Sequence, residues 1–248
     1  MTQKQLSRST HLTVHVHKDE AAMAERAAHI FAQQCEEAIA ERGIFNIALS
    51  GGTTPIPFFR LLSSSDWAER LPWDKISIYF VDERCVGPDH PDSNYGMIRR
   101  ELLSHISATR YYRIRAENNP EQIAIQYEQM IREHFQTATE TPRFDFILLG
   151  MADDGHVGSI FPNSPAISEK KRLCIDQYVP ERKADRITLT LPLINNTRCC
   201  MFLVSGKEKH STLQKALDLL SPHTLPAQKV HPKFGELIWI VDEAAALG

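Results

Sequence analysis

Short apolar segments alternate along the chain with stretches of helical periodicity. Apolar runs of strand length occur at residues 44–49, 75–81, 144–149, 198–204 and 237–241. Leu12, Val14 and Val16 alternate with polar residues, as in an exposed edge strand. Residues 18–42 instead show apolar positions three or four apart and end at Gly43, which is typical of a helix and its stop. Continuous apolar strands between helices predict a parallel-rich sheet.

The remaining segments fit the same α/β class. Weaker strand character appears at residues 111–114, 172–179 and 186–191, and further helices are predicted from about residues 55 and 94, over residues 123–134 and from residue 207. We therefore predict a Rossmann-like, parallel-rich sheet with helices on both faces, and 248 residues leave room for a small additional lobe. Residues 1–10 are predicted to be a flexible tail, and residues 11–248 a single domain.

Polar side chains follow the predicted strand at residues 144–149 without a gap. Asp153, Asp154, Gly155 and His156 come directly after it. In an open α/β sheet, ligands bind beyond the carboxyl ends of the strands, so these groups stand where chemistry usually occurs. A polar turn that contains a histidine by chance explains the spacing about as well.

Three other predicted strands also end in polar groups. The strand at 44–49 runs into Ser50, Gly51, Gly52 and Thr53, a small loop before a helix that suits an anion. A plain helix cap explains this loop almost as well. The strand at 75–81 opens onto Asp82-Glu83-Arg84, and Lys207-Glu208-Lys209 begins a helix after residue 206. Lysines at a helix start oppose the helix dipole unless an anion binds there.

A common edge for these four segments would create a site for a phosphorylated sugar. Arg84 and Lys209 would supply positive charge, and the glycine loop would supply backbone N–H groups. His156 would act as general base or acid, because imidazole titrates nearest neutrality. Neither a metal nor a cofactor is called for by this arrangement.

Composition narrows the class of protein further. A net charge of −3 argues against a protein that coats nucleic acid. No apolar run reaches membrane-spanning length, and the first ten residues lack a secretory signal. Five cysteines without a Cys-x-x-Cys pair indicate reduced thiols and no zinc framework. We expect a cytoplasmic protein with no membrane or nucleic-acid partner.

Six sequence blocks resemble the 6-phosphogluconolactonases, within a wider family that includes the glucosamine-6-phosphate deaminases. LGMADDGHVGSIFP resembles the family signature LGMGxDGHxASLFP, and ALSGGTTP, FVDER, DSNYGMIRRELL, RITLTLPLIN and VSGKEK match further blocks. The resemblance extends from about Ala21 to the C-terminus. It implies hydrolysis of 6-phospho-D-glucono-1,5-lactone to 6-phospho-D-gluconate, a step of the oxidative pentose phosphate pathway.

The resemblance also implies roles for the residues of the matched blocks. His156 would activate water, Asp154 would orient the imidazole or a sugar hydroxyl, and Arg84 would hold the oxyanion or the phosphate. The expected substrate and phosphate ligands are Ser50, Gly51, Gly52, Thr53, Asn94, Arg186 and Lys209. The expected partner is the sugar-phosphate lactone alone, for a monomer or weak homodimer without metal or cofactor.

Two positions depart from the signature. Ala152 replaces a usual glycine, and it would be strained if the loop requires positive φ there. Gly158 stands where the family often has alanine, an exchange that we expect to be harmless.

Three other classes of protein are alternatives to a lactonase. The deaminases resemble DGHIAFNEP, with a glutamate five positions after the histidine, where this chain has Phe161. Sugar-phosphate sensor domains share the fold, but about a dozen residues before the first strand do not hold a helix-turn-helix. A serine hydrolase would use Ser50 or Ser159, and neither lies in G-x-S-x-G.

Overall fold

The computed structural model describes residues 11–218 and 224–248. The predicted tail at residues 1–10 lies outside the described residues, and so does Leu220, an apolar position of the helix predicted from residue 207. Within the described ranges, no helix combines the length and the apolar character needed to cross a membrane.

Seven parallel strands form the main sheet, in the order β1-β10-β9-β6-β2-β3-β5. Their bounds are β1 His11–His17, β2 Phe45–Leu49, β3 Ile76–Phe80, β5 Arg110–Tyr112, β6 Phe146–Gly150, β9 Cys199–Val204 and β10 Glu236–Asp242. The central strands are buried on both faces, which explains why their sequences are continuous apolar runs. The predicted α/β class is confirmed, and β1 is an edge strand as its alternation indicated.

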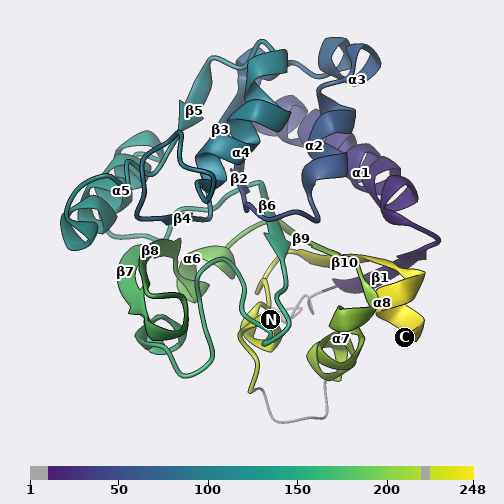
Figure 1. Cartoon of the computed structure of the whole chain (residues 1–248). Helices are drawn as coiled ribbons and strands as arrows, with labels where there is room; N and C mark the ends of the chain where they lie inside the picture. Colours follow the sequence, from purple (N-terminus) through teal and green to yellow (C-terminus); the bar gives the residue numbers. More distant parts are fainter. Residues whose placement is uncertain (1–10, 219–223) are drawn as a thin grey trace, which may run out of the picture.

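Helices cover the sheet on both sides (Figure 1). They are α1 Glu20–Arg42, α2 Ile56–Leu62, α3 Ser65–Arg70, α4 Asn94–Glu101, α5 Pro120–His134, α6 Leu191–Ile194, α7 His210–Leu217 and α8 Glu243–Leu247. The longest helix, α1, begins where the Asp19 carboxylate accepts the Ala22 N–H at 2.8 Å, and it ends at Gly43 with φ +76°. Phe31 of α1 packs edge-on against Phe45 and Phe146, which fixes the helix against β2 and β6.

A small antiparallel sheet accounts for the additional lobe. It consists of β4 Asp82–Arg84, β8 Ala184–Leu189 and β7 Cys174–Val179, in that order. The segment Asp82-Glu83-Arg84 was expected as a polar strand end, but it is a strand itself, and Arg84 pairs with Arg186 of β8. Three consecutive charged residues have no apolar periodicity, so the pattern does not reveal this strand.

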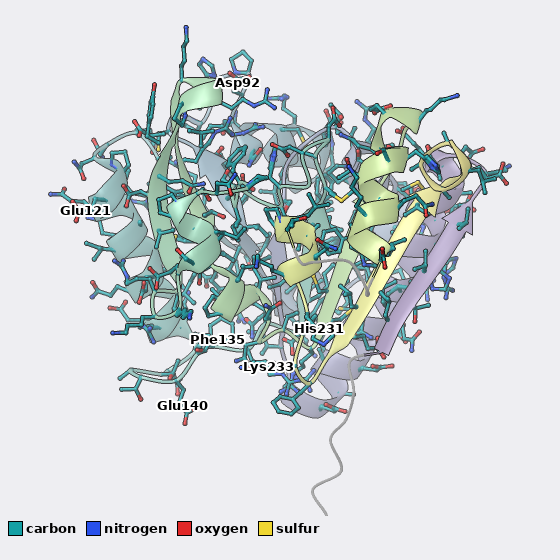
Figure 2. All side chains as sticks on the ribbon, turned by 90° about the horizontal axis from the view of Figure 1, so that it is seen from below. Asp92, Glu121, Phe135, Glu140, His231 and Lys233 are labelled. Carbon is teal, nitrogen blue, oxygen red and sulfur yellow. The ribbon has the colours of Figure 1, made fainter. Side chains whose placement is uncertain are left out.

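The two ends of the main sheet differ in the segments they carry (Figure 2). Asp92, in the loop after β4, lies at one end of the molecule, whereas Glu140 and Lys233, in the loops that precede β6 and β10, lie at the other. The segments that follow β2, β3, β6 and β9 therefore share the end marked by Asp92, because parallel strands point the same way.

Candidate active site

A cavity of about 330 Å³ lies at the carboxyl ends of the central strands. All four polar segments that the sequence singled out contribute to its wall, together with the start of α1. The wall is formed by Glu20, Ser50, Gly51, Gly52, Thr53, Thr54, Pro55, Asp82, Arg84, Asn94, Gly150, Met151, Ala152, His156, Gly158, Ser205, Gly206, Glu208 and Lys209. The fold thus brings together segments more than 150 residues apart in the chain.

The glycine loop after β2 packs directly against Asn94 at the start of α4. A Cβ atom on Gly51 would lie 1.9 Å from Asn94 Oδ1, so only glycine fits there. Asn94 Nδ2 donates to the Asp82 carbonyl at 2.9 Å. Ser50 Oγ and Asn94 Oδ1 are buried and have no hydrogen-bond partner within the described part of the chain. Buried polar atoms normally have partners, and both residues stand in the wall of the cavity.

His156 and Asp154 form a closely held pair in the loop after β6. His156 Nδ1 lies 2.7 Å from Asp154 Oδ1, and the His156 backbone N–H donates to the same oxygen at 3.0 Å. A carboxylate only accepts, so Nδ1 carries the proton of the neutral ring and Nε2 keeps its lone pair. The imidazole also packs on Phe161, with ring centroids 4.1 Å apart. The ring is therefore fixed in both orientation and tautomer.

Asp154 is charged despite its partial burial. Burial alone would raise the pKa of this carboxyl, but the hydrogen bonds from the His156 side chain and backbone outweigh it and hold the pKa below its ordinary value. The side chain of Asp154 is 47% exposed and that of His156 is 18% exposed. The negative charge thus stands beside the imidazole but partly in solvent.

The backbone angles of the loop that carries His156 show the effect of the two departures from the family signature, Ala152 and Gly158. The residues with positive φ are Gly155 at +79° and Gly158 at +55°, whereas Ala152 is not among them. The backbone strain that a positive φ would cause at Ala152 is therefore absent. The expectation that alanine at 158 is harmless was wrong for this chain, because a Cβ on Gly158 would also lie 2.9 Å from Val81 Cγ1.

Two cationic side chains line the cavity. Lys209 Nζ forms an ion pair with the Asp153 carboxylate, and its side chain is 18% exposed against 69% for Asp153. Arg84 Nη1 donates to the Asp92 carbonyl at 2.5 Å, while its Nε is buried without a partner among the described residues. Both cations thus have a protein contact, but neither is enclosed by acidic groups.

Two of the predicted site residues, Asp154 and Arg186, do not line the cavity. Arg186 pairs directly with Arg84 across the β4–β8 register, so the two side chains lie side by side on the same face of the small sheet. Burial, and then the neighbouring positive charge of Arg84, lower the pKa of Arg186 below its ordinary value. Matched sequence blocks indicate that a residue is near a site, but they do not show whether it lines the cavity.

Glu83 has a structural role beside the site that its sequence pattern did not predict. The buried Glu83 carboxylate accepts from Ser93 Oγ, from the backbone N–H groups of Asn94 and Tyr95 and from its own neighbour Arg84, at 2.7–3.0 Å. Burial raises the pKa of Glu83 despite these hydrogen bonds. Glu83 therefore fixes the start of α4, and with it Asn94, against β4. Only the pair of acidic residues ahead of a Ser-Asn helix start hints at this role.

Two further polar contacts support the cavity wall. Ser159 Oγ donates to the buried Asp82 carboxylate at 2.7 Å, and Ser205 Oγ donates to Glu20 Oε1 at 2.8 Å. Ser159 is thus committed to Asp82, which removes it as a candidate nucleophile. No group of three or more histidine, cysteine, aspartate or glutamate side chains is placed to hold a metal ion in the described ranges.

The arrangement combines amide and cationic groups around the SGGT loop with a fixed imidazole across the same cavity. It defines an α/β enzyme with a site for a small anionic ligand and for proton transfer to or from it.

Comparison with known proteins identifies the family. The chain belongs to the glucosamine-6-phosphate isomerase/6-phosphogluconolactonase family, whose model matches residues 18–239. It is 40% identical over 229 residues to a 6-phosphogluconolactonase of Synechocystis sp., covering 90% of this chain and 92% of the relative. It is 37% identical over 239 residues to a 6-phosphogluconolactonase of Nostoc sp., covering 94% and 96%. The crystal structure of 6-phosphogluconolactonase from Thermotoga maritima superimposes with a TM-score of 0.80 at 28% identity, covering 94% of this chain and all of that one.

Proposed function

We propose that this chain hydrolyses 6-phospho-D-glucono-1,5-lactone to 6-phospho-D-gluconate, a step of the oxidative pentose phosphate pathway. The relatives of nearly equal length that are named 6-phosphogluconolactonase support this activity. The observation that carries it is the placement of His156, with Nδ1 held by Asp154, in the wall of the cavity that also contains Lys209 and the SGGT loop.

His156 acts as general base in this proposal. Its Nε2 takes a proton from a water molecule whose oxygen attacks C1 of the lactone. The tetrahedral intermediate then collapses, the bond between C1 and the ring oxygen breaks, and the imidazolium returns the proton to that oxygen. The water supplies OH to C1 and H to the leaving oxygen, so His156 returns to its neutral form and one water is consumed for each lactone. Asp154 stabilises the imidazolium while it exists, because its carboxylate contacts Nδ1.

The other end of the cavity would hold the 6-phosphate. Ser50, the Gly51-Gly52 backbone and Thr53 offer hydrogen-bond donors, and Lys209 offers a charge. A phosphate carries more charge than the Asp153 carboxylate, so it replaces Asp153 as the partner of Lys209. Asn94, whose buried Oδ1 lacks a partner, suits a sugar hydroxyl.

Arg84 would serve the reacting carbonyl or the phosphate, and Arg186 would act through Arg84, its partner in the β4–β8 pairing. Both guanidinium groups have a buried Nε without a partner among the described residues. Arg186 is not among the residues of the cavity wall. We assign it a positioning role, in which its positive charge and its place opposite Arg84 direct the Arg84 side chain toward the substrate.

Position 161 favours lactone hydrolysis over deamination of an amino-sugar phosphate. The pattern of the deaminases has a glutamate five residues after the histidine, and this chain has Phe161 at that position. Phe161 packs its ring on the His156 imidazole, so no carboxylate assists His156 from that side. We further propose a cytoplasmic monomer or weak homodimer, a state that sedimentation at several protein concentrations would test.

The deciding experiment is a time course with freshly generated lactone, corrected for spontaneous hydrolysis. Acid release above the spontaneous rate, in proportion to enzyme concentration, is the expected result. A parallel reaction with glucosamine 6-phosphate should release no ammonia. Ammonia release without lactone hydrolysis would assign the chain to the deaminases instead.

A further inference from the structure

A second cavity, of about 400 Å³, lies between α4, β5 and α5. In Figure 1, α5 and β5 lie to the left of β3, and β5 is the edge strand next to β3 in the main sheet. The cavity is lined by Tyr95, Tyr111, Tyr112, Arg113, Arg115, Ile123, Gln126, Tyr127, Met130 and His134, and it shares no residue with the cavity of the candidate active site.

Aromatic rings make up half of the residues in this wall, and several of them pack on one another. Tyr95 and Tyr111 are stacked, with centroids 6.3 Å apart and planes 29° apart. Tyr112 packs on His134 at 4.2 Å. The hydroxyl of Tyr127 accepts the Phe80 backbone N–H at 2.8 Å, which anchors α5 to the main sheet. The result is a preformed aromatic surface, of which Tyr111 remains 43% exposed.

Positive charge is concentrated around the same cavity. Residues 94–115 contain five arginines and one glutamate, in a chain whose net charge is −3. Arg113 lies over the Tyr95 ring at 5.4 Å and pairs with Glu117 at 2.7 Å. Arg115 lines the cavity, and in the described part of the chain it forms no ion pair. Thus one guanidinium reinforces the aromatic wall and the other is available to an anion.

We propose that this cavity binds a nucleoside phosphate. A planar base would stack on the exposed face of Tyr111, and the phosphate would contact Arg115, with Arg113 close by. Stacking on aromatic side chains beside cationic groups is the physical basis of nucleotide and single-strand recognition in general. The cavity volume is in the range of small-molecule sites and too small for a macromolecular groove. This site is separate from the proposed lactone site and does not depend on its assignment.

The test must separate the two cavities, because the first one also suits a phosphate. We would titrate the full chain with AMP, adenosine and inorganic phosphate by isothermal titration calorimetry. The expected result is one AMP per chain, with adenosine and inorganic phosphate each binding more weakly than AMP, since each lacks half of the contacts. AMP that binds no better than inorganic phosphate, or not at all at millimolar concentration, would overturn the proposal.

Matched variants locate the site. Tyr111→Ala should weaken AMP binding about fivefold or more, the effect of losing one stacked base, whereas Tyr111→Phe keeps the ring and should bind AMP as the parent does. Arg115→Gln should weaken binding about two- to fivefold, as for an exposed ion pair. Tyr178→Ala removes a tyrosine on β7 that is more exposed than Tyr111 and does not line this cavity, and it should have no effect.

Lys209→Ala provides the opposite control, since Lys209 lines only the first cavity. AMP binding that persists in Lys209→Ala and falls in Tyr111→Ala supports the proposal. AMP binding that disappears in Lys209→Ala and persists in Tyr111→Ala places the nucleotide in the first cavity and refutes it. If Tyr111→Ala fails to fold, Arg115→Gln decides by the same criterion, because that side chain makes no ion pair that the described fold would lose.

Discussion

The contact between Asp154 and His156 yields the sharpest prediction for the proposed mechanism. The change Asp154→Asn keeps the size of the side chain and removes its charge. The imidazole then loses the carboxylate that lies 2.7 Å from Nδ1 and that stabilises the imidazolium during proton transfer. The backbone N–H of His156 can still donate to an amide oxygen, so the loop is expected to keep its shape.

The size of the effect follows from the geometry. Two unit charges about 4 Å apart interact by about 1 kcal/mol in water and about 4 kcal/mol near a protein surface. Asp154 is 47% exposed, so screening places the pair in the lower part of this range, at about 1–2.5 kcal/mol. If this energy is realised in the transition state, kcat falls about 5- to 70-fold.

The assay is the kcat and KM of lactone hydrolysis, with Asp153→Asn as the matched control. Asp153 is the adjacent carboxylate, 69% exposed, and it contacts Lys209 rather than His156. Asp154→Asn should lower kcat and leave KM within about twofold, whereas Asp153→Asn should leave kcat unchanged. Asp154 has a pKa below its ordinary value, so it is ionised at neutral pH, where the difference should be measured. Equal kcat in the two variants would refute the assigned role of Asp154.

Three further changes test other parts of the account. Lys209→Met should raise KM about tenfold or more with little change in kcat, whereas Lys207→Met in the same turn should change neither; equal KM values would remove Lys209 from phosphate binding. Gly158→Ala should lower the free energy of unfolding by about 1–3 kcal/mol, because φ is +55° and Val81 is in the way; denaturant unfolding would measure it, and an unchanged midpoint would contradict the backbone geometry. Glu83→Gln should cost about 2–4 kcal/mol, because an amide group would face N–H donors. Burial raises the pKa of Glu83 above 4.5, so the folded state binds this proton more tightly than the unfolded state does, and the free energy of unfolding falls as pH rises through the raised pKa. Glu83→Gln should remove this pH dependence of the free energy of unfolding. An identical pH dependence in the variant and the parent would contradict the assignment.

The hydrophobic pattern predicts the main sheet well because its strands are buried on both faces. Runs such as residues 144–149 and 198–204 have no solvent face, so their sequences are unambiguous. The small sheet is different, because β4 consists of three charged residues whose pairing with β8 depends on tertiary contacts alone. The pattern therefore indicates strands at 172–179 and 186–191 without showing that they form a separate antiparallel sheet.

The candidate site was predictable where chain order and strand direction decide the outcome. Parallel strands must deliver Ser50, His156 and Lys209 to one edge, and the structure places all three in one cavity wall. The pairing of Arg84 with Arg186, and the absence of Arg186 from the cavity wall, were not predictable, because both depend on tertiary contacts. The role of Glu83 was missed for the same reason, since four hydrogen bonds to one carboxylate arise only in the folded chain.

The central claim is that His156 removes a proton from water at Nε2. The most direct measurement is the kcat of His156→Gln with freshly generated lactone, beside the KM of the same variant and its thermal unfolding. We predict that kcat falls about a hundredfold to ten-thousandfold while KM and the unfolding temperature stay close to those of the parent. A folded His156→Gln protein that hydrolyses the lactone at the parental rate would contradict the account.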